Sequence, residues 1–261
     1  MKKKITAKVL KQEELTNGIY SLYLEVEDFA DAHSGQFVMI YPGAGENLLG
    51  RPISLCEVSG DRRIIRLVYR VAGAGTDRIS HLKGNETVQV LGPLGNGYDM
   101  EIAGKAQTPV LMGGGIGIPP MLQLAKDIYA VSGRKPIALL GYRDRNLFLA
   151  DCFEETAQVI IATEDGSVGT KGNVMDALRE KALDPDMICA CGPMPMLRAI
   201  KNYAVESDIK AYISLEERMA CGVGACLGCV TKTAHIDDHS KVNNARVCTE
   251  GPVFEAREVL P

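Results

Sequence analysis

The chain has 261 residues, 46% of them hydrophobic and 24% charged, and a formal net charge of −4. A weakly acidic chain without a long basic run does not favour nucleic-acid binding. No stretch approaches the ~18 apolar residues that a membrane-spanning helix needs, and no apolar segment of a signal peptide follows the lysines at residues 2–4. We therefore expect a soluble cytoplasmic protein with neither nucleic-acid nor membrane partners.

Residues 1–100 form the first predicted unit. Segments rich in Tyr, Val and Ile alternate there with turns that contain Gly, Pro and Asn, which favours strands and a small antiparallel barrel. One short helix is expected at 76–83, where Thr76 or Asp77 could cap the first turn. The expected strands are 5–10, 19–26, 36–41, 51–58, 64–71 and 87–91.

Residues 101–210 form a second unit after the turn-rich connector 92–97. Strands and helices alternate in it, which predicts a parallel α/β sheet covered by helices. From residue 215 onward the chain is rich in Gly and Cys with little periodicity, so we expect a cysteine-rich third segment, 211–261, that something other than a core holds. The expected elements of the second unit are strands at 109–112, 136–141, 159–163 and 187–191, and helices at 119–130, 174–181 and 195–205.

Several short segments of the barrel are candidates for a flavin site. Arg51 and Arg70 supply fixed positive charge for a diphosphate, Ser54 a hydroxyl for the flavin edge, and Tyr69 a ring to pack on it. A helix start at Thr76 would offer N–H groups to phosphate. Each residue alone is more often ordinary barrel surface than a ligand, so the combination carries the prediction. The candidates are Arg51, Pro52, Ile53, Ser54, Val68, Tyr69, Arg70, Gly75 and Thr76.

A glycine loop joins the strand at 109–112 to the following helix. Such a junction presents backbone N–H groups to a phosphate, although the spacing is not that of the Rossmann fingerprint. A second strand of the same sheet ends in Cys191-Gly192-Pro193, and open α/β sheets bind ligands at such strand ends. A turn that only packs a helix on the sheet is the alternative. The candidates for nucleotide binding are Gly113, Gly114, Gly115, Gly117, Cys191, Gly192 and Pro193.

Acidic residues follow another strand of this sheet, at Glu164 and Asp165. They could accept hydrogen bonds from a ribose and would repel a 2′-phosphate, which favours NAD over NADP. A solvated Asp-Gly turn is the alternative.

Four cysteines near the end of the chain give the most specific pattern. Four residues separate Cys221 from Cys226, two separate Cys226 from Cys229, and eighteen separate Cys229 from Cys248. This is the ligand spacing of plant-type [2Fe–2S] proteins. Structural zinc sites usually pair their ligands in two short knuckles; zinc, a [4Fe–4S] cluster and plain buried cysteines remain as alternatives.

Three segments in this order resemble the ferredoxin–NADP reductase superfamily of flavoproteins: Arg51-Pro52-Ile53-Ser54, 113–120 and Cys191-Gly192-Pro193. The cysteine-rich segment narrows the resemblance to the family of electron-transfer subunits of class 1B, NAD-dependent dihydroorotate dehydrogenases. One departure is Ile53, where many members of the superfamily carry Tyr. The resemblance therefore does not predict a ring that stacks on the flavin at that position.

The resemblance implies three redox stations: FAD in the barrel, NAD as the substrate of the α/β unit, and [2Fe–2S] on the four cysteines. It also implies a separate FMN-containing catalytic subunit that oxidises dihydroorotate to orotate in pyrimidine biosynthesis, in a heterotetramer of two plus two. Cys191 is expected near the nicotinamide, with a buried strand-end thiol as the alternative.

The predicted function follows from how each station handles electrons. A nicotinamide takes two electrons as hydride and an iron–sulfur cluster passes one at a time, so a flavin, which can do both, would stand between them. We expect electrons to pass from the FMN through the cluster and FAD to NAD⁺, with no catalytic side chain acting as acid or base. The alternative is the small subunit of an NADH-dependent ferredoxin:NADP oxidoreductase or of a sulfide dehydrogenase. Some of those subunits replace one ligand Cys by Asp, whereas all four positions here are Cys.

Overall fold

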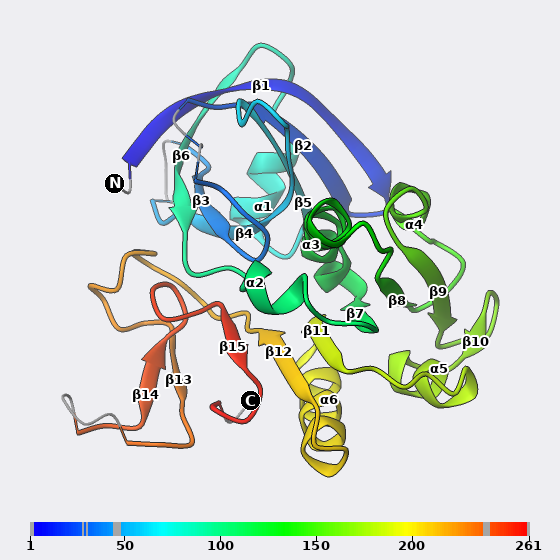
Figure 1. The fold of residues 1–261 in the computed structure, drawn as a ribbon. Coiled ribbons are helices and arrows are strands. Elements are labelled where there is room, and N and C mark those ends of the chain that lie inside the picture. Colours follow the sequence, from blue (N-terminus) through cyan, green and yellow to red (C-terminus); the bar gives the residue numbers. More distant parts are fainter. Residues whose placement is uncertain (1–2, 28, 30, 44–47, 237–240, 260–261) are drawn as a thin grey trace.

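The computed structural model describes residues 3–27, 29, 31–43, 48–236 and 241–259. Figure 1 shows a barrel, a helix-covered sheet and a C-terminal segment that lies beside both. This confirms the fold class expected from the sequence: an antiparallel barrel, a mostly parallel α/β sheet and a cysteine-rich segment.

The barrel closes with its strands in the order β1-β2-β5-β4-β3-β6, and every pairing is antiparallel. Side chains alternate along the strands, so that Leu22 and Leu24 face a core shared with Ile65 and Leu67. The short helix α1 (Ala74–Ser80) follows β5. The strands are β1 (Lys3–Thr16), β2 (Ile19–Glu25), β3 (Phe37–Tyr41), β4 (Arg51–Val58), β5 (Ile64–Arg70) and β6 (Thr87–Leu94).

The second sheet has seven strands in the order β10-β9-β8-β7-β11-β12-β15, all parallel except the last. Its central strands β7 and β11 are buried along their whole length, as expected for strands covered on both faces. The bounds are β7 (Pro109–Gly114), β8 (Ile137–Tyr142), β9 (Gln158–Thr163), β10 (Thr170–Lys171), β11 (Met187–Cys191), β12 (Lys210–Ser214) and β15 (Val253–Glu255).

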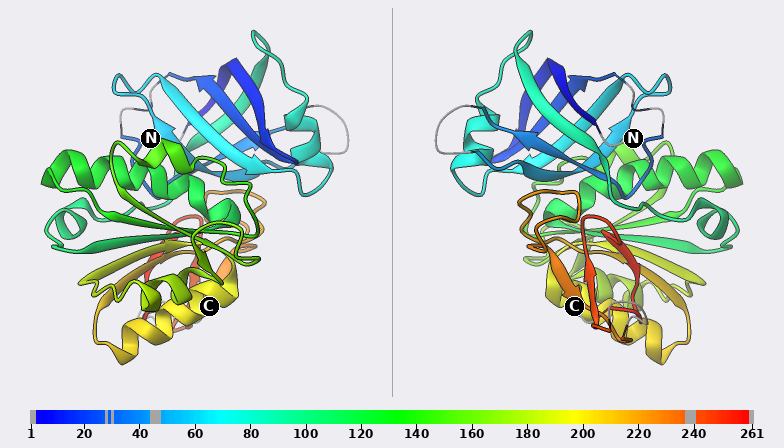
Figure 2. Two further views of the ribbon diagram at one scale, coloured as in Figure 1. Left: turned by 90° about the vertical axis from the view of Figure 1, so that its right-hand side faces the viewer. Right: turned by 90° about the vertical axis from the view of Figure 1, so that its left-hand side faces the viewer.

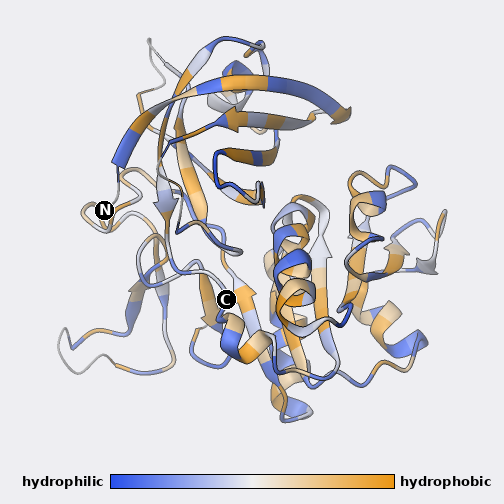
Figure 3. Ribbon diagram, turned by 45° about the horizontal axis from the view of Figure 1, so that its top comes forward, coloured by the Kyte–Doolittle hydropathy of each residue, from blue (hydrophilic) through white to orange (hydrophobic). Residues whose placement is uncertain are grey.

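Helices cover both faces of this sheet. One face packs against α3 and the short helices α2 and α4, and the other packs against α5 and α6. Figure 3 shows hydrophobic residues along the strands and mixed hydropathy along the helices. None of the helices in the described part of the chain is long and apolar enough to cross a membrane. The helices are α2 (Met100–Ala103), η1 (Gly115–Gly117), α3 (Ile118–Ser132), α4 (Ala150–Phe153), α5 (Val174–Glu180) and α6 (Met194–Glu206).

The C-terminal segment differs from the expectation that something other than a core holds it. Strand β15 pairs with β12 at the edge of the sheet, with Phe254 opposite Ile213. Cys229, Val247 and Cys248 belong to the same buried cluster as that face of the sheet. The segment also contains a hairpin of β13 (Val230–Lys232) and β14 (Asn244–Arg246). Its buried residues lie in short runs between turns, such as 247–248 and 251–254, so the sequence shows no period there.

Helix α3 connects the two larger units because it packs against both β4 of the barrel and β7 of the sheet. Figure 2 shows the barrel on one side of this helix layer and the sheet on the other. The glycine loop at the start of α3 is therefore held next to the barrel strand that carries the candidate flavin residues.

Candidate functional site

A cavity of about 810 Å³ opens between the barrel, the start of α3 and residues 215–219. Its volume lies within the ~300–1,000 Å³ range of small-molecule sites. Eight of the nine residues predicted for a flavin line it: Arg51, Pro52, Ile53, Ser54, Val68, Tyr69, Arg70 and Thr76.

The ninth residue, Gly75, lies behind the cavity wall and makes room for Arg51. A Cβ at Gly75 would stand 2.1 Å from Arg51 Nε, so the guanidinium lies across the backbone of α1. Arg51 Nη1 also donates a hydrogen bond to the Leu49 carbonyl at 2.6 Å. The Arg51 charge is therefore held in place at the cavity, where a diphosphate could accept from it.

Tyr69 borders the cavity with a ring that is already packed. Its side chain is 1% exposed, its ring stacks on Tyr20 with centroids 6.0 Å apart, and its hydroxyl donates to Gln12 Oε1 at 2.9 Å. Burial raises the pKa of Tyr69, so the hydroxyl stays protonated. Tyr69 thus presents a rigid apolar surface rather than a mobile ring.

The opposite wall of the cavity was missed by the sequence analysis. Phe37 comes from β3, and Ile116 and Pro120 come from the glycine loop and the first turn of α3. A second group comes from the segment that leads to the cysteines: Leu215, Glu216, Glu217, Arg218 and Met219. The sequence analysis assigned the glycine loop to a nucleotide and gave residues 215–219 no binding role, since only the fold brings these segments to the barrel.

A second cavity of about 920 Å³ lies at the carboxyl ends of the parallel strands. Among the predicted nucleotide residues, Gly114, Gly115 and Pro193 line it, and so does Glu164 at the end of β9. Arg143 and Arg179 also line it and were not predicted. The cavity thus combines glycine backbone, two carboxylates (Asp144 and Glu164) and three cations (Arg70, Arg143 and Arg179) at the place expected for a dinucleotide.

The other four predicted residues, Gly113, Gly117, Cys191 and Gly192, form the packing behind this wall rather than its surface. A Cβ at Gly117 would lie 2.2 Å from the Cys191 carbonyl oxygen, and a Cβ at Gly192 would lie 2.6 Å from Met196 Cε. These glycines let the ends of β7 and β11 meet. The Cys191 side chain is 1% exposed and burial raises its pKa, so it is a neutral thiol.

The two cavities meet at Arg70. This side chain lines both of them, and its Nη2 lies 3.5 Å from the position that a Cβ would occupy at Gly115. A molecule in the barrel cavity and one in the sheet cavity therefore share a wall.

The four predicted ligand cysteines lie as two neighbouring pairs, Cys221 beside Cys226 and Cys229 beside Cys248. Within the described residues, no group of three or more His, Cys, Asp or Glu side chains is arranged to hold a single metal ion. Two thiols for each of two irons is the arrangement that a [2Fe–2S] cluster with four Cys ligands requires.

Backbone N–H groups surround the first pair. Val223 N and Cys226 N each donate to Cys221 Sγ at 3.4 Å, and Gly228 N donates to Cys226 Sγ at 3.4 Å. Burial raises the pKa of Cys221, but these donors outweigh it and lower the value to about 6. The loop therefore favours thiolate sulfur, which is the ligand form for iron.

The cysteine loop lies against the barrel near the first cavity. Gly222 has φ +70°, and a Cβ there would stand 2.8 Å from Met39 Cγ and 3.1 Å from Leu94 Cδ1. Met219 lines the cavity, and Cys221 follows it after one residue. The cysteines, the barrel cavity and the sheet cavity are thus neighbours in that order.

Comparisons with known proteins agree with this geometry. Residues 216–260 match the family model of the iron–sulfur cluster binding domain of dihydroorotate dehydrogenase B. The electron transfer subunit of dihydroorotate dehydrogenase B (NAD(+)) from Listeria monocytogenes is 43% identical over 97% of both chains. The corresponding subunit from Bacillus mycoides is 42% identical over 97% of this chain and 96% of its own.

A solved structure extends the likeness to three dimensions. The structure of an NADH-dependent reduced ferredoxin-NADP oxidoreductase, described for flavin-based electron bifurcation, aligns with a TM-score of 0.84 at 26% identity. The alignment covers 97% of this chain and 89% of that one.

Proposed function

The chain belongs to the family of electron transfer subunits of dihydroorotate dehydrogenase B, and from that premise we propose that it carries electrons from a catalytic subunit to NAD⁺. The observation that carries the proposal is the order of its three sites. The cysteine loop borders the barrel cavity, and the barrel cavity shares Arg70 with the sheet cavity. Electrons entering at the cluster would therefore have one contiguous route to the nicotinamide.

The residues present fit the proposed cofactors. FAD would occupy the barrel cavity, with Arg51 and Arg70 against its negative charge and Ser54 within the same wall. Cys221, Cys226, Cys229 and Cys248 would hold [2Fe–2S]. A flavin supplies the exchange between hydride transfer and single-electron transfer. The chain's own contribution is to fix the charges around the cavity and to donate N–H groups to the cluster sulfurs.

NAD would occupy the sheet cavity. Gly114 and Gly115 allow close approach of a phosphate, and Arg143 and Arg179 supply positive charge. Glu164 is placed to accept hydrogen bonds from a ribose, which supports NAD rather than NADP.

The proposed partner is an FMN-containing catalytic subunit that oxidises dihydroorotate to orotate, in a heterotetramer of two plus two. Exposed apolar residues around the cysteine loop support docking there, namely Val223, Leu227 and Val230. Contact at this loop would bring the partner's flavin next to the cluster. The proposed location is the cytoplasm, where a reducing environment keeps thiols free, and all eight cysteines of this chain are free.

The test is dihydroorotate-dependent reduction of NAD⁺ by the tagged chain purified with the subunits that accompany it. We expect turnover with NAD⁺ and its loss, by more than about 100-fold, in Cys226→Ser, because electrons would have no cluster route. The partner's FMN should remain reducible by dihydroorotate in that variant. Val205→Ser, at an exposed position of α6 outside all three sites, is the control and should keep full turnover.

A second candidate function is supported by the solved structure with a TM-score of 0.84: the small subunit of an NADH-dependent ferredoxin:NADP oxidoreductase. Absence of dihydroorotate turnover, with flavin and cluster absorbance intact, would favour it over our proposal.

A further inference from the structure

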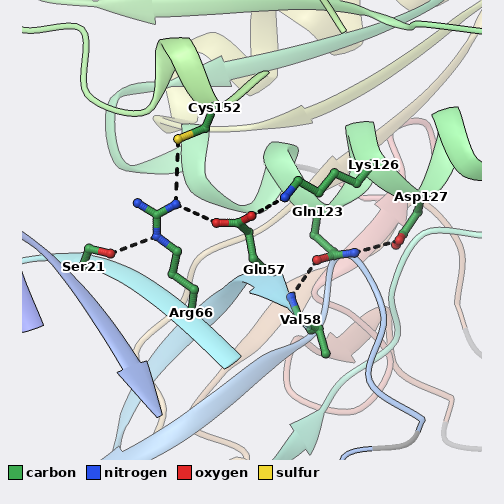
Figure 4. Close-up of polar contacts among 8 residues, drawn as sticks. All are labelled: Ser21, Glu57, Val58, Arg66, Gln123, Lys126, Asp127 and Cys152. Atoms are coloured by element: carbon green, nitrogen blue, oxygen red, sulfur yellow. Dashed lines mark hydrogen bonds and ion pairs between the residues drawn. The ribbon is translucent and has the colours of Figure 1, made fainter. Parts of the chain in front are cut away.

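A network of polar contacts joins the end of β4 to helices α3 and α4 (Figure 4). Glu57 on β4 accepts a hydrogen bond from Arg66 Nη1 of β5 at 2.6 Å and another from Lys126 Nζ of α3. Arg66 also donates to Ser21 Oγ at 2.9 Å and to Cys152 Sγ of α4 at 3.8 Å. One carboxylate thus binds a cation from each of the two large units.

A second contact lies next to it. Strand β3 pairs only with residues 51–54 of β4, so the far end of β4 has no strand on that side. The Val58 N–H donates instead to Gln123 Oε1 of α3 at 2.7 Å. Gln123 is 6% exposed, and its Nε2 donates to Asp127 Oδ1 at 2.8 Å. The amide of Gln123 is therefore oriented by its own helix to cap an edge of the barrel.

Three contacts of this network cross between the units: Glu57–Lys126, Val58–Gln123 and Arg66–Cys152. The Arg66 and Glu57 side chains are 9% and 21% exposed, whereas Lys126 is 40% exposed. An exposed ion pair alone contributes little to stability, so the contact between the units depends on the enclosed carboxylate of Glu57 and on the buried Gln123 that bonds Val58 beside it.

The same elements carry both the network and the cofactor cavities. Strand β4 begins with residues that line the barrel cavity and ends at Glu57 and Val58. Pro120 of α3 lines that cavity, and Lys126 lies about 9 Å further along the helix. Arg66 lies about 13 Å along β5 from Arg70, the shared wall of the two cavities. A shift of α3 on β4 would therefore change how the cavities face each other.

We propose that Lys126 and Gln123 are positioning residues for hydride transfer: they hold the α/β unit on the barrel in the placement at which the two cavities meet at Arg70. The inference rests on the proposed function for the identity of the two occupants. Reactions of this kind depend on placement to about 1 Å, so a loosened interface slows the transfer without emptying either site.

The test compares Lys126→Met with wild type in the purified, cofactor-loaded complex. This substitution removes only the α3 side of the contact and leaves Glu57 paired with Arg66, so folding is preserved. Lys126→Arg is the conservative rescue. Lys181→Met is the matched control, because it removes an exposed ion pair with Glu180 that lies within one unit.

Two readouts are needed. Hydrogen exchange of the Val58 amide reports the interface directly, and stopped-flow absorbance reports flavin reduction by saturating NADH. In that step NADH loses a hydride and becomes NAD⁺, while the flavin gains its two electrons and proton. We expect Val58 exchange about 10-fold faster and the limiting reduction rate about 5- to 10-fold lower in Lys126→Met, with KM for NADH within about twofold. Lys126→Arg should restore both, and Lys181→Met should change neither.

Other outcomes would overturn the inference. Faster Val58 exchange with an unchanged reduction rate would make the network structural only. A slower reduction with Val58 still protected would place the effect of Lys126 elsewhere. Failure of NADH to reduce the wild-type flavin would overturn the proposed function and this inference with it.

Discussion

Gly75 has no Cβ, and this leaves room for the side chain of Arg51. The Arg51 guanidinium lies across its Cα, at 2.1 Å from the position of a Cβ. A methyl group there must displace a cation that the barrel cavity has fixed in place. The affinity for a diphosphate cofactor therefore depends on a residue that does not line the cavity.

We predict that Gly75→Ala weakens FAD binding by about 10-fold, because the displaced Arg51 loses its charge-assisted contact with the diphosphate, a change of about 1.4 kcal/mol. Titration of the deflavinated chain with FAD, followed by flavin fluorescence, measures it. Gly73→Ala is the control, since a Cβ at Gly73 meets nothing within 4 Å and its backbone is extended. Equal affinity in the two variants would show that Arg51 does not bind the cofactor.

Glu57 makes the contact between barrel and helix sensitive to acid. Burial raises its pKa, but hydrogen bonds from Lys126 and Arg66 outweigh burial and leave the pKa below the ordinary value of 4.5. A carboxyl whose pKa is lower in the folded than in the unfolded chain stabilises the fold above the unfolded value. That stabilisation is lost as the pH falls through the folded pKa.

We predict that the difference in denaturant midpoint between wild type and Glu57→Gln is largest above pH 4.5 and shrinks below it. Urea unfolding followed by circular dichroism at a series of pH values measures the difference. Glu101→Gln, at an exposed position of α2, is the control and should show little difference at any pH. A difference that grows on acidification would contradict the assigned role of Glu57.

At the scale of elements, β15 ties the cysteine segment to the sheet. Phe254 lies opposite Ile213 of β12, and it shares a buried cluster with Cys229 and Cys248. The two most buried of the proposed cluster ligands thus depend on an edge strand of three residues.

We predict that Phe254→Ala destabilises the chain by about 3 kcal/mol, as expected for truncating a buried Phe, and speeds loss of the cluster. Denaturant unfolding measures the first effect, and decay of visible cluster absorbance under a chelator measures the second. Val205→Ala, on the exposed side of α6, should change both by little. If Phe254→Ala is destabilised but loses the cluster at the wild-type rate, cluster retention does not depend on β15.

Elements with a clear period were predictable from the sequence. Five of the six barrel strands, four strands of the sheet and helices α3, α5 and α6 lie within a few residues of their expected positions, whereas β1 continues to Thr16 instead of ending at residue 10. The strands and α-helices that were not expected are α2, α4, β10, β12, β13, β14 and β15. Apart from the five-residue β12, each has only two to four residues, which is too few side chains to show a period.

The same limit applies to the candidate site at the scale of the whole molecule. Spacing alone marked the four cysteines, because their ligand pattern is local. The sequence did not predict that Glu216, Arg218 and Met219 form a wall of the barrel cavity, since that wall exists only where the third segment meets the barrel. The contact of Lys126 with Glu57 was equally invisible, because it joins residues 69 positions apart.

The pairing of β12 with β15 gives the molecule a modular design. Ser214 and Val253 are partners in neighbouring strands, so the chain leaves the sheet, forms the cysteine loop and returns to the place where it left. An insertion whose two ends lie side by side can be lengthened, shortened or exchanged without changing the strand order of the sheet. The barrel and sheet alone would still bring a flavin to a nicotinamide. The cysteine segment adds one-electron transfer to a flavin and nicotinamide pair that exchanges two electrons. Replacing this segment alone is therefore a direct way to couple the same barrel and sheet to a different one-electron partner.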